Sequence, residues 1–216
     1  MFADREEAGR RLAKLLAGRP LVDPLVLAVP RGGVTVGAAL AREIGAELDV
    51  VLVRKLRAPW QEEYALGAVA EDGRVVWNPE AADLVEGARD LVDRESGVQR
   101  EEIERRRRLL RSVRPEARVA GRSVIVADDG IATGSTLVAA LLVVRSRGPR
   151  EIIVAVPVAP ADGLSEVGRH CDEVVCAESP EDFIAIGAFY EDFTQVGDDE
   201  VVRLLGRAER DRRSAV

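Results

Sequence analysis

Histidine, lysine and cysteine are scarce in this chain of 216 residues. The single histidine, His170, has no further imidazole partners, which excludes a usual zinc site built on histidines and favours a packing or surface position. The two cysteines, Cys171 and Cys176, lie beside an apolar run in a chain without a secretory signal, so we expect reduced core residues and no disulfide. Only two of the 31 basic residues are lysines, which makes Lys55 conspicuous.

Long apolar runs and an excess of positive charge are also missing. No run approaches the roughly 18–20 residues that a membrane span requires, and the chain becomes charged at Asp4, unlike a secretory signal peptide. The 38 acidic residues outnumber the 31 basic ones, so the formal net charge is −7. Non-specific nucleic-acid binders carry the opposite balance. We therefore expect a cytoplasmic protein with no membrane association, for which a nucleic-acid partner is disfavoured.

Apolar runs alternate with helical patterns along most of the chain. Buried strands are predicted at Leu25–Val29, Leu48–Val53, Ser123–Ala127, Ile152–Pro157 and Glu173–Cys176. Helices are predicted at Asp4–Gly18, Val34–Ile44, Leu137–Ser146 and Leu164–Arg169. Strands that alternate with helices form right-handed crossovers, so the pattern predicts an α/β fold, a mostly parallel sheet flanked by helices. With no repeat and no linker, residues 1–216 are interpreted as one domain.

The middle of the chain departs from this alternation. Residues Gly67–Glu71 and Arg74–Trp77 predict a short antiparallel β segment that turns between them. Ala58–Leu66 shows no periodicity and is interpreted as a loop. A highly charged segment at about 79–114 has a helical pattern with acids and bases intermixed, which is typical of a solvated helix with ion pairs between successive turns. An RNA-contacting arm is the alternative.

One loop carries most of the chemistry, and we call Asp128–Thr136 the motif loop. A buried strand runs directly into its acid pair, Asp128 and Asp129, and a turn rich in hydroxyl side chains then opens a helix. Amide groups at a helix start favour an anion such as phosphate, while adjacent carboxylates suit vicinal hydroxyls or a hydrated Mg²⁺. A phosphate beside a diol describes ribose 5-phosphate. An acidic turn followed by a helix cap is the alternative for each part taken singly.

Residues Val124–Thr136 resemble the motif with which type I phosphoribosyltransferases bind 5-phosphoribosyl-1-pyrophosphate (PRPP). The chain also resembles a bacterial group of such proteins whose substrate is not settled, through Val29–Gly33, Val53–Leu56, Gly67–Val69 and the aromatic C-terminal segment. The resemblance implies the type I phosphoribosyltransferase fold, Mg²⁺ as a cofactor that the acid pair holds directly or through water, and a homodimer. It implies that the acid pair is catalytic and holds the ribose hydroxyls. It also implies that the 5-phosphate is bound by Ala132, Thr133, Gly134, Ser135 and Thr136.

Two further segments are expected to meet the ligand. The glycine loop, Pro30–Gly33, follows the first strand and is interpreted as a pyrophosphate site, to which Arg31, Gly32 and Gly33 contribute; the resemblance adds a cis peptide bond, and a plain turn into a helix is the alternative. Lys55 is a catalytic candidate and Arg54 a pyrophosphate-binding one, because they precede a loop that could close over the substrate and exclude water. A solvated surface loop is the alternative. Arg57 also precedes that loop, and Glu62, Glu63 and Tyr64 are expected to close in with it.

The acceptor site is the least determined part. Half of the eight aromatic residues lie between Phe183 and Phe193, in a segment at about 178–206 that the resemblance identifies as a hood over the base. We expect Ile131 and the rings of Tyr190 and Phe193 to contact the base, with filling of core space as an equal alternative for the rings. Hypoxanthine–guanine enzymes commonly have an acid at the place of Ala132, so that class is disfavoured. Gly130, where a bulkier residue is common, leaves the pocket shape open.

Three functions are compatible with these residues. The first is Mg²⁺-dependent transfer of the 5-phosphoribosyl group from PRPP to a nitrogen of a nucleobase or related acceptor, with release of pyrophosphate. The second is a PRPP- or nucleotide-sensing regulator without catalysis, whose arginine-rich helix contacts RNA. The third is a hydrolase or accessory module that binds another sugar phosphate. The intact acid pair favours the transferase.

Overall fold

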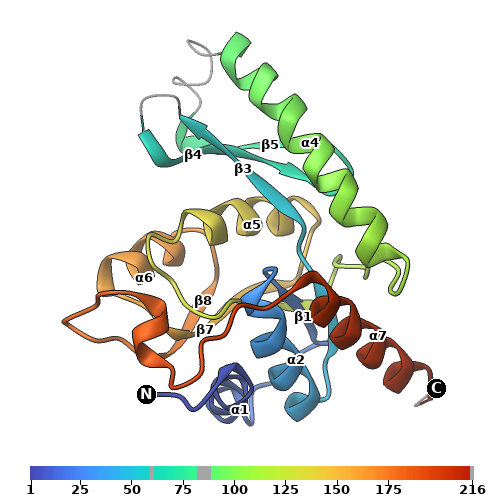
Figure 1. Cartoon of the computed structure of the whole chain (residues 1–216), viewed down its shortest axis with the longest axis vertical. Helices are drawn as coiled ribbons and strands as arrows, with labels where there is room; N and C mark the ends of the chain where they lie inside the picture. The colour runs from blue at the N-terminus through green and yellow to red at the C-terminus, as the bar shows by residue number, and fades with distance from the viewer. Residues whose placement is uncertain (59–60, 82–88, 215–216) are drawn as a thin grey trace.

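A five-stranded parallel sheet forms the centre of the protein in this computed structural model, which describes residues 1–58, 61–81 and 89–214 (Figure 1). The strand order is β2-β1-β6-β7-β8 and every neighbouring pair is parallel. The strands are β1 (Leu25–Ala28), β2 (Glu47–Val50), β6 (Ser123–Ala127), β7 (Glu151–Val158) and β8 (Glu173–Glu178). The predicted α/β architecture is therefore confirmed, and the predicted boundaries of β6 coincide with the observed ones.

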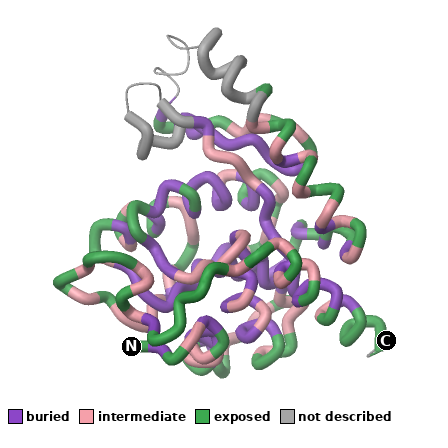
Figure 2. Tube along the Cα trace, viewed as in Figure 1, coloured by how far each residue is buried: buried purple, intermediate pink, exposed green. Residues whose placement is uncertain are grey.

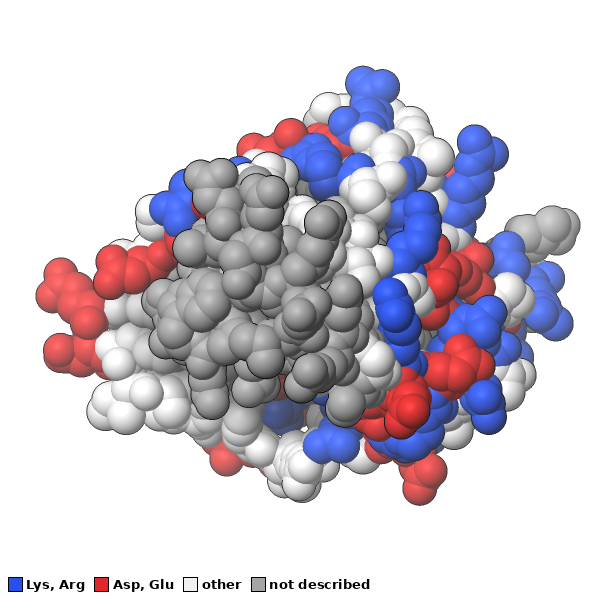
Figure 3. All heavy atoms as spheres, turned by 90° about the horizontal axis from the view of Figure 1, so that it is seen from above, with Lys and Arg blue, Asp and Glu red and all other residues white. Residues whose placement is uncertain are grey.

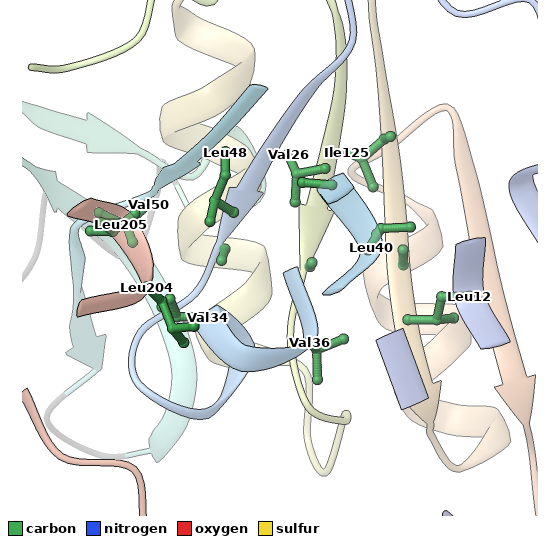
Figure 4. Close-up of a cluster of buried hydrophobic side chains, with 14 of the residues drawn as sticks. Leu12, Val26, Val34, Val36, Leu40, Leu48, Val50, Ile125, Leu204 and Leu205 are labelled. Carbon is green, nitrogen blue, oxygen red and sulfur yellow. The ribbon is translucent and has the colours of Figure 1, made fainter. Parts of the chain in front are cut away.

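Helices cover both faces of this sheet (Figure 1). One face carries α1 (Arg5–Leu16), α2 (Gly32–Ile44) and α7 (Asp198–Ser214), and the other carries α5 (Ser135–Ser146) and α6 (Ala161–Gly168). Alternate residues of β1 serve the two layers, since Val26 packs with the first group of helices and Leu27 with the second. Figure 4 shows the first layer, in which Leu12 and Leu204 lie toward opposite ends of the cluster and Leu40 lies between them.

A second, smaller sheet lies over α5 (Figure 1). It is antiparallel, in the order β3-β4-β5, and consists of β3 (Val53–Ala58), β4 (Gln61–Ala70) and β5 (Val75–Trp77). Ala68 and Ala70 pack on Ala139 and Val143 of α5, and this contact attaches the small sheet to the core. The tube in Figure 2 is accordingly buried over Leu66–Ala70, the last part of β4.

The prediction of a loop at Ala58–Leu66 is wrong for the part that the structure describes. Residues 61–66 belong to β4, which pairs with β3 on one side and continues to its pairing with β5. Leu66 is fully buried, in a cluster with Leu56 and Ile103. Pairing with neighbouring strands decides the conformation of this segment, so its lack of hydrophobic alternation was not informative. Pro59 and Trp60 lie outside the described residues.

The charged segment contains a short 3₁₀ helix, η1 (Pro79–Ala81), and the long helix α4 (Arg89–Arg111). Successive turns of α4 are joined by ion pairs such as Arg105–Glu102 at 2.9 Å and Arg108–Glu104 at 3.1 Å. Figure 3 shows both basic and acidic side chains over the described part of this face. The ion pairs of α4 are those expected of a solvated helix.

A buried ion network ties the end of α4 to the central sheet and to α7. Arg111 donates to Asp49 of β2 at 2.7 Å, and Arg114, which is only 2% exposed, donates to Glu47 at 2.5 Å and also to Glu209 of α7. Burial raises the pKa of Asp49. Burial also acts to raise the pKa of Glu47, but hydrogen bonds from Arg122 and Arg114 outweigh it, so the pKa of Glu47 is lowered. Because each buried charge has an opposite neighbour, removing one member would leave the others uncompensated.

The expected hood at about 178–206 has two structurally different parts. Its first part contains the 3₁₀ helix η2 (Ile186–Phe189), and its last residues, from Asp198, begin α7. Leu204 and Leu205 of α7 pack into the core against α2 and the central sheet, so this end of the segment does not cover a ligand site. Within the described part of the chain, no helix is both long and apolar enough to cross a membrane.

Candidate functional site

A cavity of about 280 Å³ lies at the carboxyl ends of β1 and β6. These neighbouring strands run parallel with Ala28 opposite Ala127, so the loops that follow them begin at the same level. The glycine loop and the motif loop therefore meet, although about one hundred residues separate them in sequence. Almost all of both loops lines the cavity, together with Val29, Leu137 and Ile186.

The acid pair, at the start of the motif loop, lies in the cavity wall where this loop meets the glycine loop. The amide of Asp129 donates to Asp128 Oδ1 at 2.8 Å. Burial, and next the negative charge of Asp129, raise the pKa of the Asp128 carboxyl well above its usual range. The Asp129 carboxylate has a cationic partner, because Arg5 Nε donates to its Oδ2 at 2.8 Å. The two adjacent acids are therefore electrostatically unequal.

The glycine loop packs directly on the acid pair. A Cβ atom at Gly32 would lie 1.9 Å from Asp129 Oδ2, so only glycine allows the start of α2 to come this close. The Pro30–Arg31 peptide bond is cis, as the family resemblance implied. The Arg31 guanidinium is about one-third exposed and lies 4.0 Å from Asp198 at the start of α7.

The motif loop leads into α5 through Gly134, which has a left-handed φ of 82°. As the N-cap residue of α5, Gly134 has no side chain that could cap the helix, so the helix start faces the cavity without an acidic or hydroxyl cap at that position. Lys55 Nζ on β3 donates to Ser135 Oγ at 2.8 Å, and Ser135 Oγ lies 3.2 Å from Thr133 Oγ1. The structure thus brings Lys55 to the end of the motif loop that the family motif assigns to the 5-phosphate.

Arg54 is directed elsewhere, because neighbouring residues of a strand point to opposite sides. Its guanidinium donates to Glu102 of α4 at 2.8 Å, and the arginines around Glu102, Arg105 first, lower the pKa of that carboxyl to about 2. The structure therefore does not bring Arg54 together with the glycine loop, where we expected it. The described side chains do not include Arg57, which precedes the expected closing loop, or Glu62, Glu63 and Tyr64, which were expected to close over the ligand.

Tyr190 and Phe193 do not line the cavity, contrary to the expectation that they contact a base. The Tyr190 ring packs between Phe2 and Phe193, with ring centres 5.4 and 5.0 Å away, and is 6% exposed. Its hydroxyl donates to the Asp129 carbonyl oxygen at 2.7 Å. Burial, and next the charge of Asp129, raise the Tyr190 pKa, which keeps this hydroxyl a donor. Filling of core space, the alternative, describes Tyr190 better, whereas Phe193 is 37% exposed and its ring packs against Arg5.

Two residues at the site were not anticipated from the sequence. Ile186 of η2 enters the cavity beside Ile131, and a Cβ atom at Gly130 would lie 2.7 Å from Ile186 Cγ2. Ile186 thus occupies the space that a bulkier residue at position 130 would fill. Arg5 is the other, and its contact with Asp129 joins residues 124 positions apart. Neither has a local sequence signal, because both reach the site through tertiary contacts.

Metal ligation by protein groups alone is not supported in the described part of the chain, where no cluster of three His, Cys, Asp or Glu side chains could hold an ion. The acid pair offers carboxylate oxygens only. Mg²⁺ commonly binds one or two carboxylates and takes its remaining ligands from water and substrate phosphates. The residues present therefore fit a Mg²⁺ ion that arrives with a phosphorylated ligand.

The chain is an α/β protein whose cavity lies beyond the carboxyl ends of parallel strands, the usual place of ligand sites in such sheets. The model of the phosphoribosyl transferase domain family matches residues 4–194, so the chain belongs to this family. The crystal structure of TT1426 from Thermus thermophilus is 45% identical in sequence and superposes with a TM-score of 0.90, covering 95% of this chain and 98% of the other.

Two Mycobacterium tuberculosis proteins, from strains CDC 1551 and H37Rv, carry the provisional name of phosphoribosyl transferase. Each is 43% identical over 217 residues, which cover 98% of this chain and 48% of the relative. The chain therefore spans about half the length of these relatives. Family membership supports phosphoribosyl transfer in general, and leaves the acceptor open.

Proposed function

We propose that this protein transfers the 5-phosphoribosyl group of PRPP to a nitrogen of a nucleobase-like acceptor and releases pyrophosphate. The observation that carries the proposal is the cavity itself, in which the acid pair lies between the glycine loop and the helix-opening end of the motif loop. PRPP has the matching order of groups, with a diol between a 5-phosphate and a pyrophosphate. The 5-phosphate, the diol and the pyrophosphate would each face a complementary part of the cavity wall.

The 5-phosphate would lie at the start of α5, where amide groups and the helix dipole favour an anion. Lys55 adds a positive charge there, since its ammonium group already contacts Ser135. The pyrophosphate would lie on the glycine loop, within reach of the partly exposed Arg31. These contacts fix both ends of the ligand and so place C1 of the ribose between them, where the acceptor must approach.

The acid pair would bind the ribose hydroxyls. As pyrophosphate leaves, positive charge grows on the ribose, and nearby carboxylates stabilise that charge. We propose Mg²⁺ as the cofactor: the acid pair would hold it directly or through water, and it would neutralise charge on the leaving pyrophosphate. The protein's share of that chemistry would be to hold Asp128 and Asp129 at the diol, and the close packing of Gly32 on Asp129 supports this role for Asp129.

The acceptor would contact an apolar wall. Ile131 and Ile186 line the cavity. Position 132 is an alanine, so it offers no carboxylate that could accept a proton from a purine. This favours an acceptor other than hypoxanthine or guanine. Because Ile186 fills the space next to Gly130, we infer that these two positions together set the size of acceptor that fits.

A pyrophosphate-release assay tests the proposal. The protein is incubated with PRPP and Mg²⁺ and with individual purines, pyrimidines and other nitrogen acceptors, and pyrophosphate is measured. We expect release that depends on one acceptor class and disappears in Asp129→Asn. Binding of PRPP without release with any acceptor would favour the sensor instead. Equal release by wild type and Asp129→Asn would contradict the proposed site.

A further inference from the structure

Arg5 is a nearly buried arginine, 8% exposed, at the start of α1, and it has no role of its own in the proposed reaction. It lies where three separate parts of the chain meet, namely α1, the acid pair and the aromatic segment Phe189–Thr194. A buried charge is unfavourable unless it is paired and hydrogen-bonded. The partners of Arg5 therefore indicate what holds it there and what it holds in turn.

Three contacts fix the orientation of the Arg5 guanidinium. Nε donates to Asp129 Oδ2 at 2.8 Å, Nη1 donates to the carbonyl oxygen of Thr194 at 2.9 Å, and the flat face lies 3.8 Å from the ring centre of Phe193. A planar group held at two edges and one face cannot rotate freely. A lysine could replace the charge of this group but could not make the same set of contacts.

The aromatic segment is itself fastened to the start of the chain. The amide of Phe2 donates to the Phe189 carbonyl at 2.8 Å, and the amide of Glu191 donates to the Phe2 carbonyl at 2.8 Å. Phe2 is fully buried against Tyr190. The residues that precede α1 and the aromatic segment thus form one unit, and this unit delivers both Arg5 and the Tyr190 hydroxyl to Asp129.

Asp129 is consequently held at two points. Arg5 donates a hydrogen bond to Oδ2, and the Tyr190 hydroxyl donates one to the main-chain carbonyl oxygen. Among the described residues, no hydrogen bond or ion pair engages the other carboxylate oxygen, Oδ1, which leaves that oxygen for a ligand. The held oxygen also packs on the glycine loop, because a Cβ atom at Gly32 would lie 1.9 Å from Asp129 Oδ2 and 3.1 Å from Arg5 Nε.

We propose that Arg5 is a positioning residue: it holds Asp129 against the glycine loop so that one carboxylate oxygen is presented to the ribose diol, and the aromatic segment serves to hold Arg5 in place. The proposal deepens the function proposed above and rests on it for its ligand. It replaces base stacking as the role of Tyr190 and Phe193, whose rings contact Arg5 and each other. Removing the partners that orient the ligands of a metal site typically costs roughly 10–100-fold in metal affinity or activity, and we expect an effect of the same order for the orientation of Asp129.

Calorimetric titration with PRPP in Mg²⁺ buffer tests the proposal. We expect Arg5→Gln to weaken PRPP binding about 10–100-fold. The PRPP affinity of Arg5→Lys should lie closer to that of Arg5→Gln than to that of wild type, because an ammonium group keeps the charge but lacks the planar guanidinium that orients the carboxylate. Arg11→Gln is the matched control: Arg11 lies on the same helix, stacks on Phe2 at 4.8 Å and pairs with Glu178, but does not contact Asp129. Arg11→Gln should bind about as tightly as wild type. Wild-type affinity in Arg5→Lys would overturn the proposal.

A second variant covers the case in which Arg5 substitutions impair folding. Phe193→Leu keeps an apolar side chain but removes the flat face beneath Arg5, and Phe193 is 37% exposed, so the fold should tolerate the change. PRPP affinity should fall several-fold, with the preference among acceptors unchanged. Unchanged PRPP affinity combined with altered acceptor preference would restore the base-stacking role and contradict the proposal.

A double-mutant cycle needs no ligand and separates this inference from the proposed function. The urea midpoints of Arg5→Gln, Asp129→Asn and the double variant are compared with wild type. If Arg5 acts on Asp129, the double variant will unfold at a higher urea concentration than the sum of the two single shifts predicts. Additive shifts would refute the positioning role even if PRPP binds. Coupled shifts in a protein that does not bind PRPP would refute the proposed function and leave the positioning of Asp129 supported.

Discussion

Removal of the Lys55 ammonium group should weaken the 5-phosphate end of the site and leave the pyrophosphate end intact. Lys55 Nζ lies 2.8 Å from Ser135 Oγ, and Ser135 is the first residue of α5. A phosphate bound at this helix start would accept a charge-assisted hydrogen bond from Lys55, which contributes about 1.5–3 kcal/mol. Since about 1.4 kcal/mol corresponds to a tenfold change in Kd, Lys55→Met should bind ribose 5-phosphate and PRPP about 10- to 150-fold more weakly.

The assay is calorimetric titration with three ligands, PRPP, ribose 5-phosphate and inorganic pyrophosphate, in Mg²⁺ buffer. Lys55→Met should lose affinity for the first two and keep its affinity for pyrophosphate. Arg31→Met should lose affinity for PRPP and pyrophosphate and keep its affinity for ribose 5-phosphate, because Arg31 belongs to the glycine loop. Lys14→Met is the control for the loss of a lysine as such, since Lys14 is the only other lysine and lies in the last turn of α1.

The reasoning is refuted if Lys55→Met loses affinity for pyrophosphate and keeps that for ribose 5-phosphate. Lys55 would then serve the leaving group after a movement of β3, and its contact with Ser135 would not mark the 5-phosphate position. Equal losses for all three ligands would show a general electrostatic effect, in which case the difference between Lys55→Met and wild type should shrink strongly as salt is raised.

Three further predictions concern stability, the acceptor wall and pH. Arg114→Ala should lower the free energy of unfolding by about 3–5 kcal/mol, because Glu47 and Glu209 lose a buried partner. The control Arg213→Ala removes an exposed ion pair with Glu209 and should change the free energy of unfolding by about 0.2–1 kcal/mol. Urea unfolding measures both variants. Gly130→Ala should impair turnover, since its Cβ atom would lie 2.7 Å from Ile186 Cγ2, and addition of Ile186→Ala should restore it. Asp128→Asn should raise the urea midpoint at neutral pH. The pKa of Asp128 is raised in the folded state, so its ionised carboxylate destabilises the fold, and the asparagine removes that charge. The difference between the variant and wild type should shrink as pH falls through the raised pKa towards about 4, the pKa of aspartate in the unfolded chain.

The parts of the site that follow the central strands could be predicted from sequence because their signals are local. The five-residue run before Asp128 contains only residues that β6 buries, and the loop after it must lie at the carboxyl edge. The glycine loop is placed by the same argument after β1. Once two parallel strands are neighbours, their loops meet without further information.

Features that depend on distant contacts could not be predicted in this way. Arg5 reads as one of several arginines on an amphipathic helix, and only the packing of Phe2 on Tyr190 brings it to Asp129. The clustered aromatic residues were recognised as important, but clustering does not say which side of a ring faces a ligand. The strand β4 was missed because its conformation comes from pairing with β3 and β5, and its first residues carry no alternating pattern.

Titration of the wild-type protein with PRPP in Mg²⁺ buffer, beside Asp129→Asn, tests the central claim most directly. If the motif loop and the glycine loop form a PRPP site, wild type will bind PRPP with one site per chain, and Asp129→Asn will bind it far more weakly while remaining folded at the temperature of the titration. If neither protein binds PRPP, or both bind it equally, the cavity at the carboxyl ends of β1 and β6 is not a PRPP site and the account is wrong.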